Sequence, residues 1–490
     1  MILFSVSIIN SVHQLKSIFL IGMMLGASGG SGLFANTSPN FILVLTDDQG
    51  WSSLSAPMDK SLPSAKSDFH QTPNMDALLE RGMRFSHGYA ASPVCSPTRY
   101  SVQFGKSPAR LRYTRVLGEN GANHNQVGIP QLLKAANPDY RCAHFGKWHI
   151  SADPKRYGYD EHDGRTTNKQ GGFTMRNHER EWGGYAEEDP KRVDSLTARA
   201  IAFMQDSIKS EKPFFVQISH YALHSDLVYT ADTYASTLLR KAGQLHNDRA
   251  YAAMVADLDR SVGTLLEAFD SMGLAENTYV IFTSDNGGMP CLPMQVNKGA
   301  PYAQGLNSPL LRGKWDLTEG GIRVPFAVMG PRIKAGDQSD TPVISYDLLP
   351  TIAELAGFTG LLPKNLDGRS FASVLDNSDS LITRPAEGLV FHFPHYNMVG
   401  INEPHSAIRI GDYKLLRFYS SQRDLLFDVA KDPAESTDLS GEKTVLKAQM
   451  SAALELYLEQ VSAEKPEDSN SWKKGNFGSV KTRFFERYDN

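Results

Sequence analysis

The hydrophobic residues of this chain fall into two patterns, continuous runs and helical repeats. Three continuous runs rich in β-branched and aromatic residues predict strands buried on both faces, at residues 40–46, 213–219 and 278–283. Apolar residues at helical spacing predict helices over residues 195–207, 249–272 and 347–356. Because strands and helices alternate, we expect an α/β fold with a large, mostly parallel sheet flanked by helices.

A different pattern begins near residue 385. Turn residues separate four short strand candidates and so predict an antiparallel sheet, at residues 388–392, 406–410, 413–418 and 425–428. An amphipathic helix is predicted over 442–461, and the polar last 29 residues predict an irregular tail. We therefore expect a large domain over residues 36–384 and a smaller C-terminal α+β subdomain over residues 385–490.

The first 35 residues have the pattern of a signal peptide. They carry one basic residue, Lys16, and no acidic residue, and an apolar run over 18–27 is followed by small residues. A run of about ten residues is too short to cross a bilayer, which needs roughly 20. We expect cleavage of residues 1–35 and a periplasmic or secreted protein, with an uncleaved signal anchor as the alternative.

Composition narrows the class of protein. With 50 basic and 54 acidic residues, the formal net charge is −4, and no basic stripe points to nucleic acid as a partner. The 40 glycines and 26 prolines are close to a globular average, which excludes a collagen-like or disordered chain. Three cysteines in 490 residues exclude a disulfide scaffold, and their odd number needs a reason in an exported protein.

Two of the predicted buried strands end in oxygen-bearing side chains. Asp47 and Asp48 follow the first strand, and Asp285 and Asn286 follow the strand at 278–283. The carboxyl ends of strands in an open α/β sheet form the ligand crevice. Three carboxylates and an amide suit a hard divalent ion, Ca²⁺ or Mg²⁺, better than Zn²⁺. The alternative is that each pair belongs to an ordinary turn or helix cap.

A lone cysteine precedes a predicted short helix. Pro97 fits the first position of a helix over 98–104, so Cys95 lies just before the helix N-terminus. The helix dipole and Arg99, which projects near the same end, predict a thiol with a lowered pKa and raised reactivity. The alternative is a cysteine buried in the core, the commoner state of a single cysteine.

The pentapeptide Cys95-Ser-Pro-Thr-Arg99 resembles the C-x-P-x-R signature of the type I sulfatases, and the chain is similar to that family over nearly its whole mature length. The resemblance implies an alkaline-phosphatase-like fold and hydrolysis of sulfate esters. It also implies that a formylglycine-generating enzyme converts Cys95 into Cα-formylglycine, whose hydrated aldehyde is the nucleophile. Conversion of Cys95 leaves Cys142 and Cys291, which form at most one disulfide.

Other segments match the family's motifs in the family's order. Asp47, Asp48, Asp285 and Asn286 resemble the ligands of the family's metal, which is usually Ca²⁺, so Mg²⁺ is the less favoured ion. Three more segments supply candidate site residues: Lys147 and His149 within 145–149, His224 within 221–224, and Lys314 within 310–325. One departure is Ser225-Asp226 after His224, where many relatives have Thr-Pro. Asp226 is therefore expected to place a negative charge near the pocket rim.

The resemblance also implies a role for each candidate. Lys147, Lys314 and the divalent ion hold the sulfate oxygens. Arg99 and His149 hydrogen-bond the hydrated aldehyde, and His149 later removes the proton that lets sulfate leave. His224, with Lys314, protonates the leaving alcohol. Such a two-step route suits a hydrated aldehyde, because a plain serine sulfate ester has no internal way to collapse.

The substrate is less well defined by the sequence. His392 and His395 resemble a segment that reaches the site in carbohydrate-acting relatives, which favours a sulfated carbohydrate and polysaccharide degradation. Three arginines after the catalytic helix are either ligands for acidic sugars or a solvated basic face: Arg110, Arg112 and Arg115. The rival interpretations are a phosphonate or phosphodiester hydrolase of the same superfamily and a non-catalytic protein that binds sulfated glycans. The sugar, the ester position, endo or exo action and the oligomeric state stay open.

Overall fold

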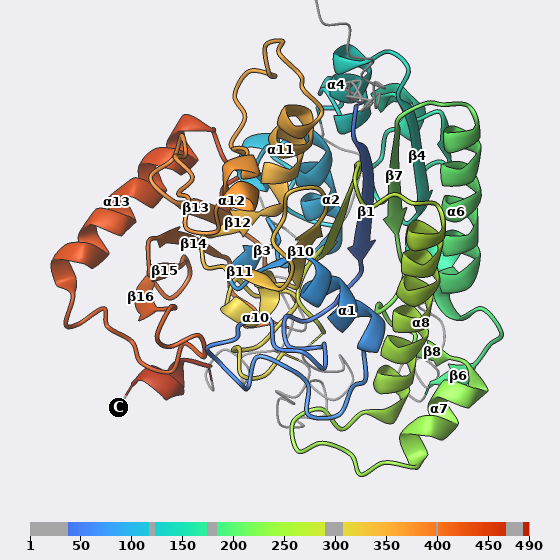
Figure 1. Cartoon of the computed structure of the whole chain (residues 1–490). Helices are drawn as coiled ribbons and strands as arrows, with labels where there is room; N and C mark the ends of the chain where they lie inside the picture. The colour runs from blue at the N-terminus through green and yellow to red at the C-terminus, as the bar shows by residue number, and fades with distance from the viewer. Residues whose placement is uncertain are drawn as a thin grey trace, which may run out of the picture. The chain divides into compact units, whose positions relative to one another are not determined.

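An eight-stranded sheet forms the centre of the computed structural model, with strand order β11-β2-β10-β9-β1-β7-β4-β5 (Figure 1). The structure describes residues 38–116, 123–173, 184–289, 307–397, 400–466 and 484–489. The predicted signal peptide and Cys291 lie outside these residues. Residues from Ser38 onward form one compact unit.

The middle of the sheet is parallel. β1 (Asn40–Thr46) pairs in parallel with β7 (Phe214–Ser219) and with β9 (Thr278–Ser284). β4 (Arg141–Gly146) and β5 (Glu161–His162) continue this direction on one side. On the other side β10 (Phe326–Met329) runs antiparallel to both of its neighbours, followed by β2 (Met83–Phe85) and β11 (Asp337–Ser339). The predicted mixed, mostly parallel α/β sheet is confirmed.

The continuous apolar run of β1 exists because helices cover both faces of the sheet (Figure 1). Ile42 and Val44 belong to one hydrophobic cluster, whereas Phe41 and Leu43 belong to another, as the two-residue period of a strand requires. The first cluster takes in α1 (Pro73–Arg81), α6 (Val193–Lys209) and α8 (Arg249–Ser271). The second takes in α2 (Cys95–Phe104), α4 (Ile129–Ala136) and α11 (Leu348–Leu355).

Shorter elements connect these layers. The remaining helices of this part are α3 (Pro108–Leu111), α7 (Ala231–Leu238), α10 (Glu319–Ile322) and α12 (Ala372–Asp376). Two small two-stranded sheets pair β3 (Gly88–Tyr89) with β12 (Val343–Ile344) and β6 (Tyr185–Ala186) with β8 (Val228–Tyr229). Within the described part of the chain, no helix is long and apolar enough to cross a membrane.

The C-terminal residues form the predicted antiparallel sheet and helix. Its strands are β13 (Leu389–Phe393), β14 (His405–Ile410), β15 (Tyr413–Phe418) and β16 (Arg423–Asp428), paired in chain order. One face packs on α13 (Thr444–Gln460), and the other packs on a hydrophobic cluster that includes Leu317 and Ile322. The predicted irregular tail is wrong for residues 484–489, because Phe484 and Phe485 are buried against Phe418 and a short 3₁₀ helix follows.

A buried ionic group joins the C-terminal sheet to the loop around α10. Lys414 of β15 lies with its Nζ 2.8 Å from Glu319 Oε1, 2.8 Å from Glu435 Oε1 and 3.0 Å from the Leu317 carbonyl oxygen. We call Lys414, Glu319 and Glu435 the anchor cluster. His405 of β14 adds a further tie, because its Nε2 accepts the Leu317 N–H at 2.9 Å. The C-terminal sheet thus holds the segment that carries Lys314.

Candidate active site

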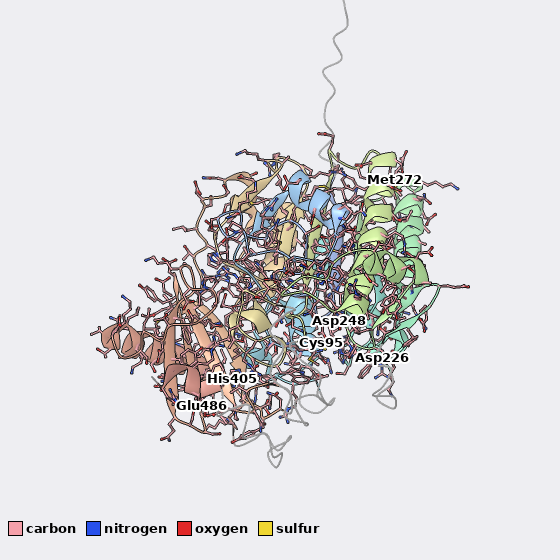
Figure 2. The ribbon with its side chains drawn as sticks, turned by 90° about the horizontal axis from the view of Figure 1, so that it is seen from below. Cys95, Asp226, Asp248, Met272, His405 and Glu486 are labelled. Atoms are coloured by element: carbon pink, nitrogen blue, oxygen red, sulfur yellow. The ribbon has the colours of Figure 1, made fainter. Side chains whose placement is uncertain are left out.

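The structure brings the four predicted oxygen ligands to one edge of the sheet. Since Thr46 is the register partner of Ser284, the residues that follow β1 and β9 emerge side by side. The Asp48 N–H donates to Asp285 Oδ1 at 3.2 Å, and Asn286 Nδ2 donates to Asp48 Oδ1 at 2.7 Å. Figure 1 shows β1 pointing downward, and Figure 2 looks onto this edge from below, with Cys95 labelled.

Three cations pair with the three carboxylates. Lys147 Nζ lies 2.5 Å from Asp47 Oδ2, and Lys314 Nζ lies 2.7 Å from Asp48 Oδ2. The third pair joins Arg99 Nε to Asp285 Oδ2 at 2.7 Å. We call this group the strand-end cluster, and all its members are buried: Asp47, Asp48, Asp285, Asn286, Arg99, Lys147 and Lys314.

The strand-end cluster keeps unsatisfied oxygens. Asp47 Oδ1 and Asn286 Oδ1 are buried, and neither has a hydrogen-bond partner among the described residues. A buried oxygen without a partner is costly unless a ligand or ion satisfies it. Asp47, Cys95 and Asp285 also offer ligand atoms that all lie within 4.8 Å of one another. The carboxylate and amide oxygens of this group fit a hard divalent cation, whereas the Cys95 sulfur as a thiol does not.

Burial and mutual repulsion shape the ionisation of these carboxylates. Burial raises the pKa of Asp48, and burial together with the charge of Asp47 raises the pKa of Asp285 to about 6. Burial also opposes ionisation of Asp47, but Lys147 and other nearby cations hold its pKa well below the usual range. The cluster is thus a place where additional positive charge is favourable.

Cys95 lies in the first turn of α2, which differs from the prediction in two ways. The helix begins at Cys95 and not at residue 98, because Pro97 is tolerated in a first turn, where backbone N–H groups have no helical partner. Burial raises the pKa of the Cys95 thiol, so the predicted lowered pKa is wrong. Cys95 Sγ lies 3.3 Å from His149 Nδ1.

The segment after β4 brings two more predicted residues to the cluster. Arg99 Nη1 donates to the Lys147 carbonyl oxygen, which ties α2 to this segment. The His149 N–H donates to the Thr166 carbonyl oxygen at 2.8 Å. Burial, Lys147 and Arg99 lower the pKa of His149 well below its usual value. This lowered pKa keeps the His149 ring in its neutral form near pH 7.

His224 follows β7 and faces the cluster from another side. Its Nδ1 lies 2.6 Å from the Ser225 carbonyl oxygen, and its Nε2 lies 3.9 Å from Asp48 Oδ2. Asn168 Nδ2 lies 3.1 Å from the same Nε2. Sequence reasoning missed Asn168, because nothing in the local pattern marks a residue that meets a histidine 56 positions away.

Asp226 lies in the interior and not on an exposed rim, since only 2% of it is exposed. Its charge, together with those of Asp47 and Glu187, acts on the buried Lys191, whose pKa burial lowers to about 8. The negative charge expected near the pocket is thus buried close to Lys191, on which Asp47 of the strand-end cluster also acts. Asp226 is followed directly by the apolar residues Leu227, Val228 and Tyr229, which are buried as well.

The two C-terminal histidines do not meet the strand-end cluster. Both ring nitrogens of the buried His392 are in use, with Nδ1 at 2.6 Å from Ser406 Oγ and Nε2 at 2.7 Å from the Glu464 carbonyl oxygen. His395 is buried with its Nε2 at 2.7 Å from Thr114 Oγ1. Their contacts tie strand β13 to neighbouring segments and do not support the predicted contact with substrate.

Two of the three predicted arginines also have structural partners. Arg110 forms a two-pronged ion pair with Asp367, with distances of 2.8 and 2.7 Å, and Arg115 pairs with Glu464. The third, Arg112, is exposed at the end of α3. Arg115 is therefore tied to Glu464 of the C-terminal part, whereas the partner of Arg110 lies in the large domain.

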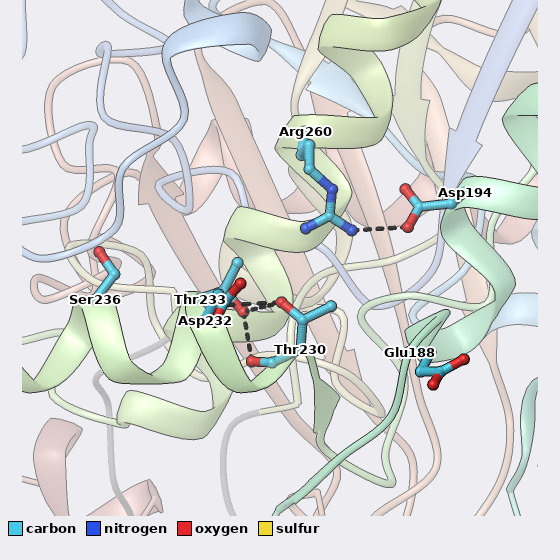
Figure 3. A pocket seen from close by; sticks show the side chains of 7 residues that line it. All are labelled: Glu188, Asp194, Thr230, Asp232, Thr233, Ser236 and Arg260. Atoms are coloured by element: carbon cyan, nitrogen blue, oxygen red, sulfur yellow. Dashed lines mark hydrogen bonds and ion pairs between the residues drawn. The ribbon is translucent and has the colours of Figure 1, made fainter.

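A hollow of about 560 Å³ lies elsewhere, between α6, α7 and α8 (Figure 3). Arg260 crosses it and pairs with Asp194 at 2.8 Å, and it also pairs with Asp257 at 2.5 Å. Asp257 also accepts the Thr230 N–H at the start of α7. The hollow holds none of the predicted site residues, and its paired charges stabilise the helix packing.

The fold and the site define the chain as an alkaline-phosphatase-like α/β protein with buried carboxylates and cations gathered at the strand ends. Its sequence matches the Sulfatase family over residues 39–358 and the family described as "N-sulphoglucosamine sulphohydrolase, C-terminal" over residues 313–464. The chain belongs to the type I sulfatases of this superfamily and is a sulfuric ester hydrolase.

Individual relatives agree with this assignment. The N-acetylgalactosamine-6-sulfatase of Mus musculus is 30% identical over 424 residues, which are 80% of this chain and 74% of that protein. An ulvan-active sulfatase of Formosa agariphila is 27% identical, over 87% of this chain and 82% of that protein. The crystal structure of Ps i-CgsB with k-i-k-neocarrahexaose has a TM-score of 0.70 and 26% identity, covering 92% of this chain and 99% of that one. The phosphonate monoester hydrolase of Agrobacterium radiobacter, at 17% identity and a TM-score of 0.62, shares the fold over 86% of this chain and 95% of that one.

Proposed function

We propose that this chain is an exported, formylglycine-dependent sulfatase that hydrolyses sulfate monoesters of carbohydrates, with Ca²⁺ as its metal. The observation that carries the proposal is the position of Cys95, which lies 3.3 Å from His149 and whose Sγ is grouped with carboxylates of the strand-end cluster. The carbohydrate substrate is proposed because relatives are named for galactosamine and ulvan sulfates and one is solved with a carrageenan oligosaccharide.

The burial of Cys95 supports its conversion to formylglycine. A thiol with a raised pKa is a poor nucleophile at neutral pH, because the thiolate is the reactive form. A hydrated aldehyde at position 95 instead offers an oxygen for attack on sulfur. Its second hydroxyl lies next to His149, the base that we propose removes a proton there and expels sulfate.

Positive charge for the sulfate oxygens comes from the cations of the strand-end cluster. Lys147 and Lys314 are both buried and reach the cluster from different segments, so they approach a bound sulfate from two sides. Arg99 holds Asp285 and supports the same crevice. A Ca²⁺ ion held by Asp47, Asp48, Asp285 and Asn286 would add Lewis-acid stabilisation of the sulfate oxygens.

His224 is the proposed donor of a proton to the leaving alcohol, together with Lys314. Burial, followed by the charge of Lys314, lowers the pKa of His224 well below its usual value in the free protein. A bound anionic sulfate ester opposes this shift, so we propose that His224 takes up its proton only with substrate present. Asn168 and the Ser225 carbonyl group fix the ring between them. This fixed ring defines the side from which the leaving sugar must approach.

The proposal includes the domain plan and the partners. Residues 36–384 form the catalytic domain, residues 385–490 form the C-terminal subdomain, and residues 1–35 direct export to the periplasm or the medium. The partners are a sulfated carbohydrate and a formylglycine-generating enzyme during maturation.

Two measurements test the proposal together. After expression with the maturation enzyme, we expect the peptide that contains Cys95 to be lighter by about 18 Da than its thiol form. The matured protein should release sulfate from sulfated sugars faster than it cleaves a phosphonate ester of the same alcohol. An unmodified thiol with no sulfate release would favour a non-catalytic glycan-binding protein. Faster cleavage of the phosphonate ester would favour a phosphonate or phosphodiester hydrolase of the same superfamily.

A further inference from the structure

A cavity of about 340 Å³ opens beside His149, and the mechanism described so far does not use it. Its lining includes Tyr113, His149, Ser151, Arg165 and Thr167. A volume of this size lies in the range of small-ligand sites in proteins. Since His149 also contacts Cys95, the cavity lies next to the reacting centre and not at a remote surface.

Hydrogen bonds and ring stacking shape this cavity before any ligand binds. The Tyr113 ring stacks on Tyr100 with 4.1 Å between ring centroids. The Tyr113 hydroxyl lies 3.3 Å from Ser96 Oγ, and the Ser151 hydroxyl lies 2.8 Å from the Tyr100 hydroxyl. A wall fixed in this way loses little conformational entropy when a ligand enters.

One short segment connects the cavity to the side of the leaving group. The Thr166 carbonyl oxygen accepts the His149 N–H at 2.8 Å, and Asn168 touches His224 at 3.1 Å. Arg165 and Thr167 therefore lie on the stretch that runs from the histidine at the nucleophile to the proposed proton donor. A sugar whose leaving oxygen is protonated by His224 therefore lies next to this stretch of the chain.

The permanent charge on the cavity lining is positive. Among the described residues that line the cavity, Arg165 is the permanently charged one and no carboxylate is present. Arg165 Nη1 donates to the Ser151 carbonyl oxygen at 3.3 Å, which directs the guanidinium along the cavity wall. A planar guanidinium recognises carboxylate and sulfate groups through paired hydrogen bonds.

We propose that this cavity binds a sugar with a second anionic group, next to the sulfate ester that is cleaved, and that Arg165 recognises that group. The group is a uronate carboxylate or a further sulfate, which share this chemistry. The inference rests on the proposed sulfatase function, and it adds an acidic substituent to the substrate at a defined side of the site.

The test compares the matured wild type with Arg165→Gln and with Lys169→Gln, a matched loss of one exposed positive charge four residues further on. Each protein is assayed on three disaccharides that carry the same sulfate ester beside a uronate, beside a second sulfate, or beside a neutral sugar. We expect Arg165→Gln to raise KM about tenfold more for an acidic neighbour than for the neutral one. The acidic substrate with the larger effect identifies the natural group, and Lys169→Gln should behave as wild type on all three.

Equal effects of Arg165→Gln on acidic and neutral disaccharides would overturn the inference and leave the sulfatase function intact. If the wild type releases no sulfate from any ester, an aryl sulfate included, the proposed function fails. In that case, calorimetry measures the binding of the two acidic disaccharides without the sulfate ester that is to be cleaved. This binding tests the cavity independently of catalysis. Binding that Arg165→Gln weakens about tenfold and Lys169→Gln leaves unchanged supports the cavity, and any other binding result contradicts it.

Discussion

Two buried groups of charges in this protein look alike in composition and differ in how completely their atoms are paired. In the anchor cluster, Lys414 contacts Glu319, Glu435 and a carbonyl oxygen. Glu319 Oε2 accepts the Tyr89 hydroxyl at 2.8 Å, and Glu435 Oε2 accepts the Glu319 N–H at 2.7 Å. Glu435 Oε1 makes no hydrogen bond among the described residues, but it lies 2.8 Å from the Lys414 ammonium group. The strand-end cluster, by contrast, leaves one oxygen of Asp47 and the amide oxygen of Asn286 with neither a hydrogen bond nor an ion pair among those residues.

The difference separates a structural ionic group from a binding site. Removing charges from water is costly, and a buried ionic group offsets that cost only where ion pairs and hydrogen bonds satisfy its atoms. A group with unpaired oxygens offsets the cost of burial only when a ligand or ion binds those oxygens. The predictions below therefore expect changes in the strand-end cluster to affect chemistry and metal dependence, and changes in the anchor cluster to affect stability.

The largest expected effect is on catalysis. Cys95→Ala should lower the rate of sulfate release at least about a thousandfold, because the residue that becomes the nucleophile is removed. The denaturant midpoint should change little, since the side chain is small. Sulfate release and urea unfolding measured on one preparation check this, and residual activity within tenfold of wild type would exclude residue 95 as the nucleophile.

Breaking the anchor cluster should have the opposite profile. Lys414→Met leaves Glu319 and Glu435 buried without their cation and should lower the free energy of unfolding by about 3–5 kcal/mol. Adding Glu435→Gln to this variant should restore part of the loss, because one uncompensated charge disappears. Urea unfolding measures both, and a loss below about 1 kcal/mol in the single variant would show that the anchor cluster is not a stabilising unit.

Removing the metal should affect only the strand-end cluster. After chelation, the wild type should lose sulfatase activity and unfold at a lower temperature, and Ca²⁺ at a hundred times its Kd should restore about 2.7 kcal/mol of stability. Asp47→Asn should weaken this response, whereas Glu435→Gln should keep it. Calorimetric scans with Ca²⁺ and with Mg²⁺ compare the two ions, and a larger gain with Mg²⁺ would correct the choice of Ca²⁺.

Sequence patterns predicted the strand-end cluster better than they predicted the anchor cluster. The apolar runs of β1 and β9 are continuous because both faces of these strands are covered, so the edge where Asp47 and Asp285 meet was predictable from strand positions. The anchor cluster was not, since Lys414 looks like an outward-facing lysine of a short strand and Glu435 like an ordinary charged loop residue. Their burial depends on how the C-terminal sheet packs on the α10 segment, which no local period encodes.

The same limit applies to individual groups in the site. The thiol of Cys95 was predicted to have a lowered pKa from the nearby helix end, but desolvation outweighs that effect in a buried position. Residues predicted from the family motifs reach the strand-end cluster where they follow strands of the central sheet, as Lys147 and His224 do. The rings of His392, in β13, and of His395, just after it, instead contact the side chains of Ser406 and Thr114.

The smallest expected effect concerns the buried, neutral His392. Burial lowers the pKa of His392 from 6.5 to about 4 in the folded protein, so the unfolded chain binds a proton first as the pH falls. The contribution to stability is therefore complete above pH 6.5 and is lost as the pH falls toward 4. Between pH 6.5 and 5.5 we expect a loss of about 1 kcal/mol from this residue. His392→Gln should lack that part of the pH dependence of urea unfolding, and a variant whose slope matches the wild type would show that folding does not shift the pKa of His392.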